Sequence, residues 1–442
     1  MTLPRYPSYK DSCVEWLGEV PGHWEVAPLF GTVAERNESN KGMQEDNLLS
    51  LSYGRIVPKD ISSNDGLLPD SFETYQIVYP GDIVFRLTDL QHDKRSLRSA
   101  IVEEKGIITS AYLAVIPKRA SPIYMSYLFR SYDTTKVFYS MGGGLRQSMK
   151  FDDLKRMPTV LPPPEEQTQI AAFLDRETAK IDVLVAEQRR LMALLKEKRQ
   201  AVISHAVTRG LNPDVPLKPS GIEWLGDVPG HWEVCKIRRA VSAIEQGWSP
   251  ECYSRPAEDN EWGVLKAGCV NRGVYDQKEN KALPEELAPM LGFEVQVGDV
   301  LMSRASGSPE LVGSTALVNS TRPKLMLSDK IFRLRFEAWM DSHFFVAVLN
   351  SRPLRIQIEQ ALSGGNGLAN NLPQSSLLAF FLCVPPLVEQ SAICEFLKIQ
   401  LAKLDTLTSE AQYAIDLLRE RRTALISAAV TGQIDVRSAV AS

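Results

Sequence analysis

Several loops of this chain place cationic, amide or hydroxyl side chains beside glycine. Arg86 and Arg304 each follow a Gly-Asp turn and a short hydrophobic run, and Ser306 and Ser308 lie just after Arg304. Phosphate groups bind cations, hydroxyls and backbone amides, whereas base edges bind Arg, Asn, Gln or Lys held in defined geometry. We therefore expect these segments to approach a nucleic acid, although an ordinary polar turn would have the same composition.

Two glycine-rich stretches occupy equivalent places, each shortly before a long helical run. The first, 142–148, contains Arg146 and Gln147, and the second, 363–371, contains Asn366, Asn370 and Asn371. Glycine lets backbone amides come close to a phosphate, so recurrence at matched positions favours a binding role. A basic cluster and further polar cations are either part of the same surface or a solvated face: Lys94, Arg95 and Arg98, with Arg55, Lys59, Lys266, Asn271 and Arg272.

Catalytic motifs are not found in the sequence. There is no phosphate-binding loop of the Gly-x-x-x-x-Gly-Lys-Ser/Thr type, no Gly-x-Ser-x-Gly elbow and no Asn-Pro-Pro-Tyr stretch. Asp259, Glu279 and Lys281 can be forced into a metal-nuclease pattern, but acid-rich loops produce such spacings by chance. The six cysteines are scattered and never form a Cys-x-x-Cys pair. We predict no catalytic residue, no cofactor and no metal site.

An internal repeat predicts the elements that position these loops. The segment 15–26 returns as 223–234 with one difference, Glu19 against Asp227. A second block, which begins at Leu161-Pro162-Pro163, returns at Val384-Pro385-Pro386. A period of this length indicates two copies of a domain plus its connector. Trp16, Trp24, Trp224 and Trp232 recur unchanged, so we interpret them as packing residues and not as base-stacking platforms, which should differ between copies.

Two long stretches without proline or glycine, from Glu165 to about Thr208 and from Val388 to about Thr431, predict two long helices. Steps of three and four between apolar residues are typical of coiled coils. The expected seams are Ile170, Leu174, Ile181, Leu184, Leu191, Leu195 and Val202 in the first helix, and Ile393, Leu397, Leu404, Leu407, Ala411, Ala414, Leu418 and Leu425 in the second. We expect an antiparallel pair; the alternative is an amphipathic helix packed on its own domain.

The segments outside the helices read as α+β domains. Short β-rich runs such as 82–85 and 299–302 are punctuated by turns, and helices are expected near 123–139 and 341–362. The predicted division is domain 1 (1–164), connector helix (165–212), domain 2 (213–386) and C-terminal connector helix (387–442). The copies share their ends and diverge in the middle, which suggests one scaffold that presents two different surfaces.

Composition sets bounds on the class of protein. The chain has 442 residues, 44% of them hydrophobic, and a formal net charge of −4. An acidic total argues mildly against a nucleic-acid binder, but binding needs a local basic face and not a basic total. No apolar stretch is long enough to cross a membrane, and scattered single thiols fit a reducing compartment. We expect a soluble cytoplasmic protein.

These features together resemble the specificity subunit of type I restriction-modification systems. The resemblance is carried by the Trp-Leu-Gly-x-Val-Pro-x-His-Trp openings, the Gly-Asp turns and the Pro-Pro…Glu-Gln helix starts, and it covers essentially the whole chain. It implies two target-recognition domains separated by two long antiparallel helices, with pseudo-two-fold symmetry. Each domain would read one half of a bipartite site in double-stranded DNA.

The resemblance also implies partners. Two DNA methyltransferase subunits would dock on the helices and restriction-translocase subunits would join the full complex, while this subunit would be non-catalytic. The predicted DNA-binding residues are Arg86, Lys94, Arg95, Arg98, Arg146, Gln147, Arg304, Ser306, Ser308, Asn366, Asn370 and Asn371. Two alternatives stay open at this point: a coiled-coil assembly adaptor that binds no DNA, and an enzyme in its own right.

Overall fold

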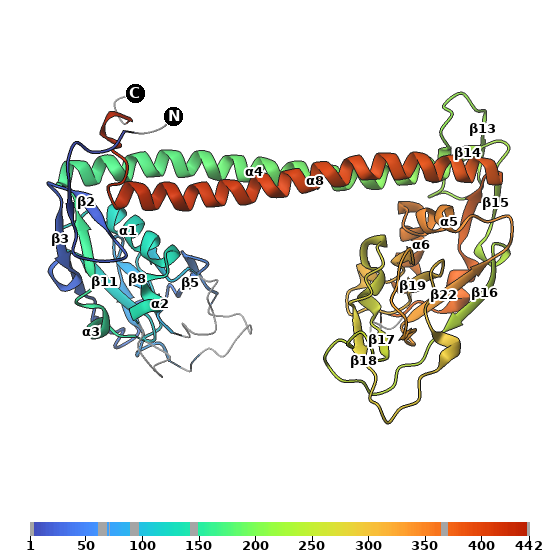
Figure 1. Cartoon of the computed structure of the whole chain (residues 1–442), viewed down its shortest axis with the longest axis horizontal. Helices are drawn as coiled ribbons and strands as arrows, with labels where there is room; N and C mark the ends of the chain where they lie inside the picture. The colour runs from blue at the N-terminus through green and yellow to red at the C-terminus, as the bar shows by residue number, and fades with distance from the viewer. Residues whose placement is uncertain are drawn as a thin grey trace. The chain divides into compact units, whose positions relative to one another are not determined.

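A computed structural model of the chain divides into two compact units (Figure 1). Unit 1 comprises Met1–Arg189 and Gln412–Ser442, and unit 2 comprises Arg190–Ala411. The structure describes residues 4–60, 69, 71–88, 97–141, 149–363 and 370–439. Each unit combines an antiparallel sheet, short helices and parts of two long helices, so the predicted α+β class is confirmed. The predicted four-part division stays a prediction, because each unit takes in part of both long helices.

Unit 1 is built on an antiparallel sheet with strand order β4-β11-β8-β9. Ile83 and Phe85 of β8 enter the largest core cluster, whereas Val84 packs in a smaller cluster. Successive side chains of a strand point to opposite faces, so this hydrophobic strand is buried on both sides. The sheet strands are β4 (Val33–Glu35), β8 (Ile83–Phe85), β9 (Ser99–Ile101) and β11 (Leu113–Pro117).

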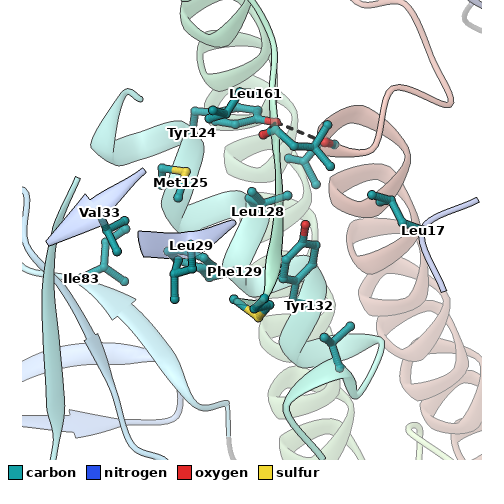
Figure 2. Packing of buried hydrophobic residues seen from close by; sticks show 14 of the residues in the cluster. Leu17, Leu29, Val33, Ile83, Tyr124, Met125, Leu128, Phe129, Tyr132 and Leu161 are labelled. Atoms are coloured by element: carbon teal, nitrogen blue, oxygen red, sulfur yellow. Dashed lines mark hydrogen bonds between the residues drawn. The ribbon is translucent and has the colours of Figure 1, made fainter. Parts of the chain in front are cut away.

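The remaining described strands of unit 1 form antiparallel pairs, which are β1 (Tyr9–Asp11) with β2 (Glu19–Pro21), β3 (Glu25–Pro28) with β12 (Pro158–Leu161), β5 (Leu49–Ser52) with β6 (Arg55–Pro58), and β7 (Gln76–Val78) with β10 (Gly106–Ile108). The short helices are α1 (Pro122–Thr134), α2 (Val137–Met141) and α3 (Phe151–Leu154). Figure 2 shows the side chains of α1 between the sheet and the long helices. The Tyr124 hydroxyl donates to the carbonyl oxygens of Val160 at 3.0 Å and Val430 at 3.2 Å, which ties α1 to the end of a long helix.

Unit 2 repeats this plan with a sheet of order β16-β22-β19-β20 and a second sheet of order β18-β17-β21. The first consists of β16 (Val241–Gln246), β19 (Val300–Ser303), β20 (Thr315–Leu317) and β22 (Ile331–Phe336). The second consists of β17 (Gly263–Leu265), β18 (Asn280–Ala282) and β21 (Leu325–Met326). Paired with one another are β13 (Leu217–Pro219) and β14 (Asp227–Pro229), and likewise β15 (Glu233–Lys236) and β23 (Phe381–Val384). The helices are α5 (Ser342–Leu349), α6 (Arg352–Ser363) and α7 (Gln374–Ala379).

The two expected medium helices are each broken in two. Helix α1 ends at Thr134 and α2 begins at Val137, with Lys136 at a left-handed φ of 66° between them. In unit 2, Asn350 ends α5, where its side-chain amide donates to the carbonyl oxygens of Thr315 and Val346. Helical structure near 123–139 and 341–362 is therefore confirmed, and each stretch consists of two helices.

Both long helices are confirmed. Helix α4 runs over Pro164–Arg209 and α8 over Leu387–Val430, and Gly210 and Gly432 follow them with φ of 73° and 75°. Glycine adopts this left-handed conformation without a Cβ penalty, which suits a helix end. In unit 1 the start of α4 packs with the end of α8, since Leu174 and Val430 share one core cluster. The helices are therefore antiparallel.

Burial confirms much of the expected seam, because these expected residues are buried: Ile170, Leu174, Ile181 and Leu195 of α4, and Ile393, Leu397, Leu404 and Ala411 of α8. Three leucines of that seam lie elsewhere. Leu184, Leu191 and Leu407 are 48%, 40% and 46% exposed, so they lie outside the seam. The less exposed positions of α4 advance in steps of four and three through residues of mixed polarity: Leu174, Thr178, Ile181, Val185, Gln188, Met192, Leu195 and Arg199. The expectation contained Leu174, Ile181 and Leu195 of this row but missed its polar members, Thr178, Gln188 and Arg199.

The two repeated sequence blocks meet at one anchor in each unit. In unit 1, His23 contacts Glu166 with an Nε2–Oε2 distance of 2.8 Å. In unit 2, Glu389 contacts His231 at 2.6 Å and accepts a hydrogen bond from the indole N–H of Trp232 at 3.0 Å. The opening of each domain is thereby fixed to the first turn of a long helix, which explains why both blocks recur together.

Candidate nucleic-acid interface

The structure brings five predicted residues of unit 2 together in one cluster, here called the unit-2 loop cluster: Arg304, Ser306, Ser308, Asn370 and Asn371. Arg304 Nε donates to Asn371 Oδ1 at 3.0 Å, and Asn370 Nδ2 donates to the carbonyl oxygen of Gly307 at 3.2 Å. The backbone N–H of Ser306 bonds the carbonyl oxygen of Asn370. Two loops that are distant in sequence are therefore held as one surface.

The guanidinium of Arg304 is positioned by packing as well as by hydrogen bonding. Its Cζ lies 5.3 Å from the centroid of the Phe332 ring, and Phe332 is buried. Among the described residues no carboxylate lies within ion-pair distance of Arg304. A cation that is oriented but not neutralised is available to a phosphate or to a guanine edge.

In unit 1 the counterpart of Arg304 is Leu87 and not Arg86. The backbone N–H of Met149 bonds the carbonyl oxygen of Leu87, as that of Leu372 bonds the carbonyl oxygen of Arg304. Arg86 is half-buried at the end of β8. The two arginines therefore stand one position apart in equivalent loops, in agreement with the Gly-Asp turns, since Arg304 lies one residue further from its turn than Arg86 does.

Arg98 is fully buried, which contradicts the expectation of a solvent-facing cluster at this residue. Its Nη1 donates to the carbonyl oxygen of Thr88 at 2.9 Å, and its Nε donates to the Tyr139 hydroxyl at 3.3 Å. Its backbone N–H bonds the carboxylate of Asp133, whose pKa is raised by burial. Arg98 thus holds the loop after β8 from within. Lys94, Arg95, Arg146, Gln147 and Asn366 lie outside the described residues, so their roles stay predictions.

The Gly-Asp turns that precede these loops are structural in both copies. The carboxylate of Asp82 accepts the backbone N–H of Tyr79 and a pair of hydrogen bonds from Arg36. Asp299 accepts the backbone N–H of Gln296 at 3.0 Å and forms ion pairs with two arginines of β22, Arg333 and Arg335. Each aspartate closes its turn and fixes the strand that leads to the candidate loop.

The four repeated tryptophans divide into two kinds. Trp24 and Trp232 are buried in the two cores, as expected for packing residues. Trp224 is half-buried against the core of unit 2, and Trp16 is 43% exposed but stands edge-on to the Tyr132 ring at 4.7 Å. Packing explains all four, although Trp16 is less enclosed than the sequence reading implied.

Within the described residues, no group of three or more His, Cys, Asp or Glu side chains is placed to hold a metal ion. Among the helices of those same residues, none is both long and apolar enough to span a bilayer.

Comparison with known sequences finds relatives of one kind. No protein-family model matches the chain. The EcoEI type I restriction enzyme specificity subunit of Escherichia coli is 32% identical over 244 residues, which is 54% of this chain and 40% of that protein. The putative MjaX specificity subunit of Methanocaldococcus jannaschii is 23% identical, with 96% of each chain covered. The EcoKI specificity subunit of Escherichia coli is 25% identical over 94% of this chain and 90% of its own length.

Solved structures agree on the fold. One that concerns complex assembly and conformational transition of the type I R-M system has a TM-score of 0.67 at 17% identity and covers 93% of this chain and 98% of its own. The HsdS subunit from Thermoanaerobacter tengcongensis has a TM-score of 0.50 at 16% identity, with 94% and 98% covered. At such identities the likeness establishes the fold alone.

Fold and internal repeat together define a chain of two α+β units, each of which includes parts of both long helices, and a solved structure shares this fold. The named relatives are specificity subunits of type I restriction-modification systems, and over more than nine tenths of its length the chain is similar to two of them.

Proposed function

We propose that this chain reads a bipartite site in double-stranded DNA, with one half-site for each domain, and docks two DNA methyltransferase subunits. Restriction-translocase subunits would join the full complex through them. The observation that carries the proposal is the unit-2 loop cluster, in which an oriented, unneutralised Arg304 stands beside two asparagines on a domain fixed by a repeated anchor. Arg and Asn are the side chains that most often read guanine and adenine edges.

The long helices support the docking part of the proposal. Large apolar side chains on both of them are exposed: Val183, Leu184, Leu191 and Leu194 on α4, and Ile399, Leu407, Tyr413 and Leu417 on α8. Single exposed apolar residues are ordinary, but a helix pair that keeps so many outside its own seam presents surface for a partner protein.

A domain exchange tests the reading of half-sites. Replacing residues 221–383 by the equivalent segment of a related subunit keeps the anchor partners His23 and Glu166 of unit 1 unchanged. Methylated positions are then mapped genome-wide in cells that carry the parent or the chimaera. We expect one half of the methylated motif to change and the other to persist. A chimaera that altered both halves together would contradict one half-site per domain.

The competing function is an assembly adaptor that binds no DNA, which the net charge of −4 favours. Binding of duplex DNA by the chain co-purified with its methyltransferase, measured over a range of salt concentrations, separates the two. A DNA reader shows affinity that falls steeply with salt because phosphate contacts release counterions. An adaptor assembles with the methyltransferase, but its own side chains add nothing to the salt dependence of DNA binding.

A further inference from the structure

A further basic surface lies in unit 1, between the β5–β6 hairpin and the two long helices. Two adjoining hollows of about 350 Å³ and 460 Å³ share three lining arginines: Arg55, Arg419 and Arg422. Arg189 lines the smaller hollow and Tyr53 the larger one. We call these five residues the arginine groove. Its arginines come from three separate elements, the β5–β6 hairpin, α4 and α8, so only the folded unit assembles it.

The hairpin wall of the groove is held rigidly. Tyr53, at the turn between β5 and β6, has a left-handed φ of 46° and is 84% exposed. Arg130 of α1 lies beneath this turn and donates from Nη2 to the carbonyl oxygens of Gly54 at 2.5 Å and Ser99 at 2.9 Å. A Cβ at Gly54 would lie 2.1 Å from Arg130 Nη1, so only glycine allows this contact. A strained backbone at an exposed aromatic residue such as Tyr53, in a turn held by hydrogen bonds from Arg130, is typical of a binding surface.

The lining of the groove has a net positive charge in a chain whose net charge is −4, because five arginines line the two hollows against three carboxylates, Glu103, Asp175 and Asp182. Asp182 is the carboxylate that lines the smaller hollow, and it is paired with Arg422. Arg419 pairs with its helix neighbour Asp416. Within the described part of the chain, Arg55 and Arg189 form no ion pair. A concave wall with two uncompensated guanidinium groups concentrates anions near it.

We propose that the arginine groove binds the phosphate backbone of a DNA strand beside the half-site that unit 1 reads. The inference rests on the proposed function and extends it to a contact that positions DNA without reading bases. Guanidinium groups match phosphate geometry, and a tyrosine hydroxyl is a common phosphate ligand. Several arginines spread over two joined hollows fit a ligand with successive charges better than a single carboxylate.

Sequence reading singled out Arg55 but not the helix arginines. Arg189, Arg419 and Arg422 lie among many charged residues of α4 and α8, where a solvated helix face is the ordinary reading. Their significance depends on the antiparallel register, which brings Arg422 of α8 next to Asp182 of α4 and both next to the hairpin. No pattern within one helix carries that information.

Two single variants test the groove, Arg55→Ala and Arg189→Ala, in the full chain purified with its methyltransferase. Arg190→Ala is the matched control, because Arg190 is also exposed but lies about 100° further round the helix and does not line the groove. Affinity for a duplex with the methylated motif and for an unrelated duplex is measured from low to high NaCl. Arg55→Lys and Arg189→Lys show whether a charge alone restores binding.

We expect each alanine variant to lower the magnitude of the slope of log K against log salt by about 0.9 for each phosphate that the removed guanidinium neutralised. Affinity for both duplexes should fall by a similar factor, the lysine variants should recover most of it, and Arg190→Ala should match the parent.

Unchanged slopes in both alanine variants would overturn the groove while the proposed function stood. Weaker binding of the specific duplex alone would indicate base reading, and failure to assemble with the methyltransferase would indicate a protein-docking face; either result overturns the proposal. A parent complex that bound neither duplex would instead refute the proposed function.

Discussion

The anchors of the two units differ at a single hydrogen bond. In unit 2 the indole N–H of Trp232 reaches Glu389, whereas the indole nitrogen of Trp24 in unit 1 has no hydrogen-bond partner among the described residues. Glu166, the counterpart of Glu389, keeps the contact with the equivalent histidine, His23, but its Oε1 has no hydrogen-bond partner among those same residues. The internal repeat thus supplies its own control for the value of one buried hydrogen bond.

Replacing Trp232 by Phe should destabilise unit 2, because it leaves the Glu389 carboxylate short of a donor. A hydrogen bond to a charged group contributes about 1.5–3 kcal/mol, to which the smaller ring volume adds. Trp24→Phe should cost less, since the N–H of Trp24 has no partner among the described residues. Urea unfolding followed by domain-specific proteolysis measures both. Equal destabilisation of the two units would show that the indole bond does not matter.

Acid should weaken unit 2 through Glu245. Burial alone would raise the pKa of Glu245, but hydrogen bonds and charges from Arg333 and Arg335 lower it below its ordinary value of 4.5. Just below pH 4.5 the Glu245 carboxyl therefore binds more protons in the unfolded chain than in the folded one. The ion pairs of Glu245 thus stabilise the folded chain above pH 4.5, and this stabilisation is lost as the pH falls. In Glu245→Gln, stability measured by urea unfolding should depend less on pH between about 3 and 6.

The control for this prediction is Glu285→Gln, since Glu285 is exposed and forms no ion pair among the described residues. Its acid dependence should match that of the parent. If Glu245→Gln also followed the parent curve, the ion pairs with Arg333 and Arg335 would have no influence on acid stability.

Arg304→Ala should reveal what the unit-2 loop cluster contacts. If the guanidinium meets a phosphate, the salt slope of DNA binding shrinks by about 0.9; if it reads guanine, discrimination at one base pair falls by about 1–3 kcal/mol. Arg239→Ala is the control, because Arg239 is exposed and already paired with Glu233. An Arg304→Ala variant with the parent's slope and the parent's base preference would remove this cluster from the interface.

At the scale of elements, the seam of the long helices can be tested in the free chain. Leu195 is 7% exposed and Leu194 is 53% exposed, although they are adjacent in α4. Leu195→Ala should cost about 2–5 kcal/mol of unfolding free energy, because it empties a buried position. Leu194→Ala should change it by about 0.5 kcal/mol or less. Urea unfolding of both variants checks the register, and a larger destabilisation at Leu194 would contradict the inward position of Leu195.

The sequence predicts that a helix or strand exists where several strong local signals agree. Proline at the entries of α4 and α8, glycine after their ends and long runs without either placed both helices to within a few residues. Part of the seam was misplaced because Leu184 and Leu191 face outward on α4, whereas polar residues such as Thr178 and Gln188 face inward. The break at Asn350 depends on a hydrogen bond to Thr315, a residue that no local pattern associates with it.

The candidate site was predictable only in part, for a related reason. Arg304, Ser306 and the asparagines were chosen by type and by repeated position, and their mutual hydrogen bonds could not be foreseen because the loops are far apart in sequence. Arg98 resembled its basic neighbours in composition, yet the hydroxyl of Tyr139 and the carbonyl oxygen of Thr88 take it into the interior. The type of a residue gives the chemistry of its side chain, but it does not show whether that side chain faces the solvent or the interior.

At the scale of the whole molecule, the internal repeat matches the two units contact by contact. Asp182 of α4 pairs with Arg422 of α8 in unit 1, and Arg199 of α4 pairs with Asp405 of α8 in unit 2. The aspartates occupy equivalent places in the two copies of the helix, and so do the arginines. Each unit therefore has the same ion pair between antiparallel helices, but α4 supplies the aspartate in unit 1 and the arginine in unit 2. Changes made at matched positions of both helices preserve this ion pair in both units.

This symmetry leads to a prediction about the length of the helices. Heptad steps keep a seam on one side of a helix, so seven added residues preserve its face and lengthen it by about 10 Å at 1.5 Å per residue. Insertions at matched places, after Val185 in α4 and after Thr408 in α8, should keep both ion pairs within their units. Under the proposed function, genome-wide mapping of methylated positions should then show an unread gap longer by about three base pairs at 3.4 Å each, with the bases of each half-site unchanged. Matched insertions of five residues serve as the control, since they rotate the seam and should abolish methylation. An active seven-residue variant that methylates at the original spacing would show that the helices do not set the gap.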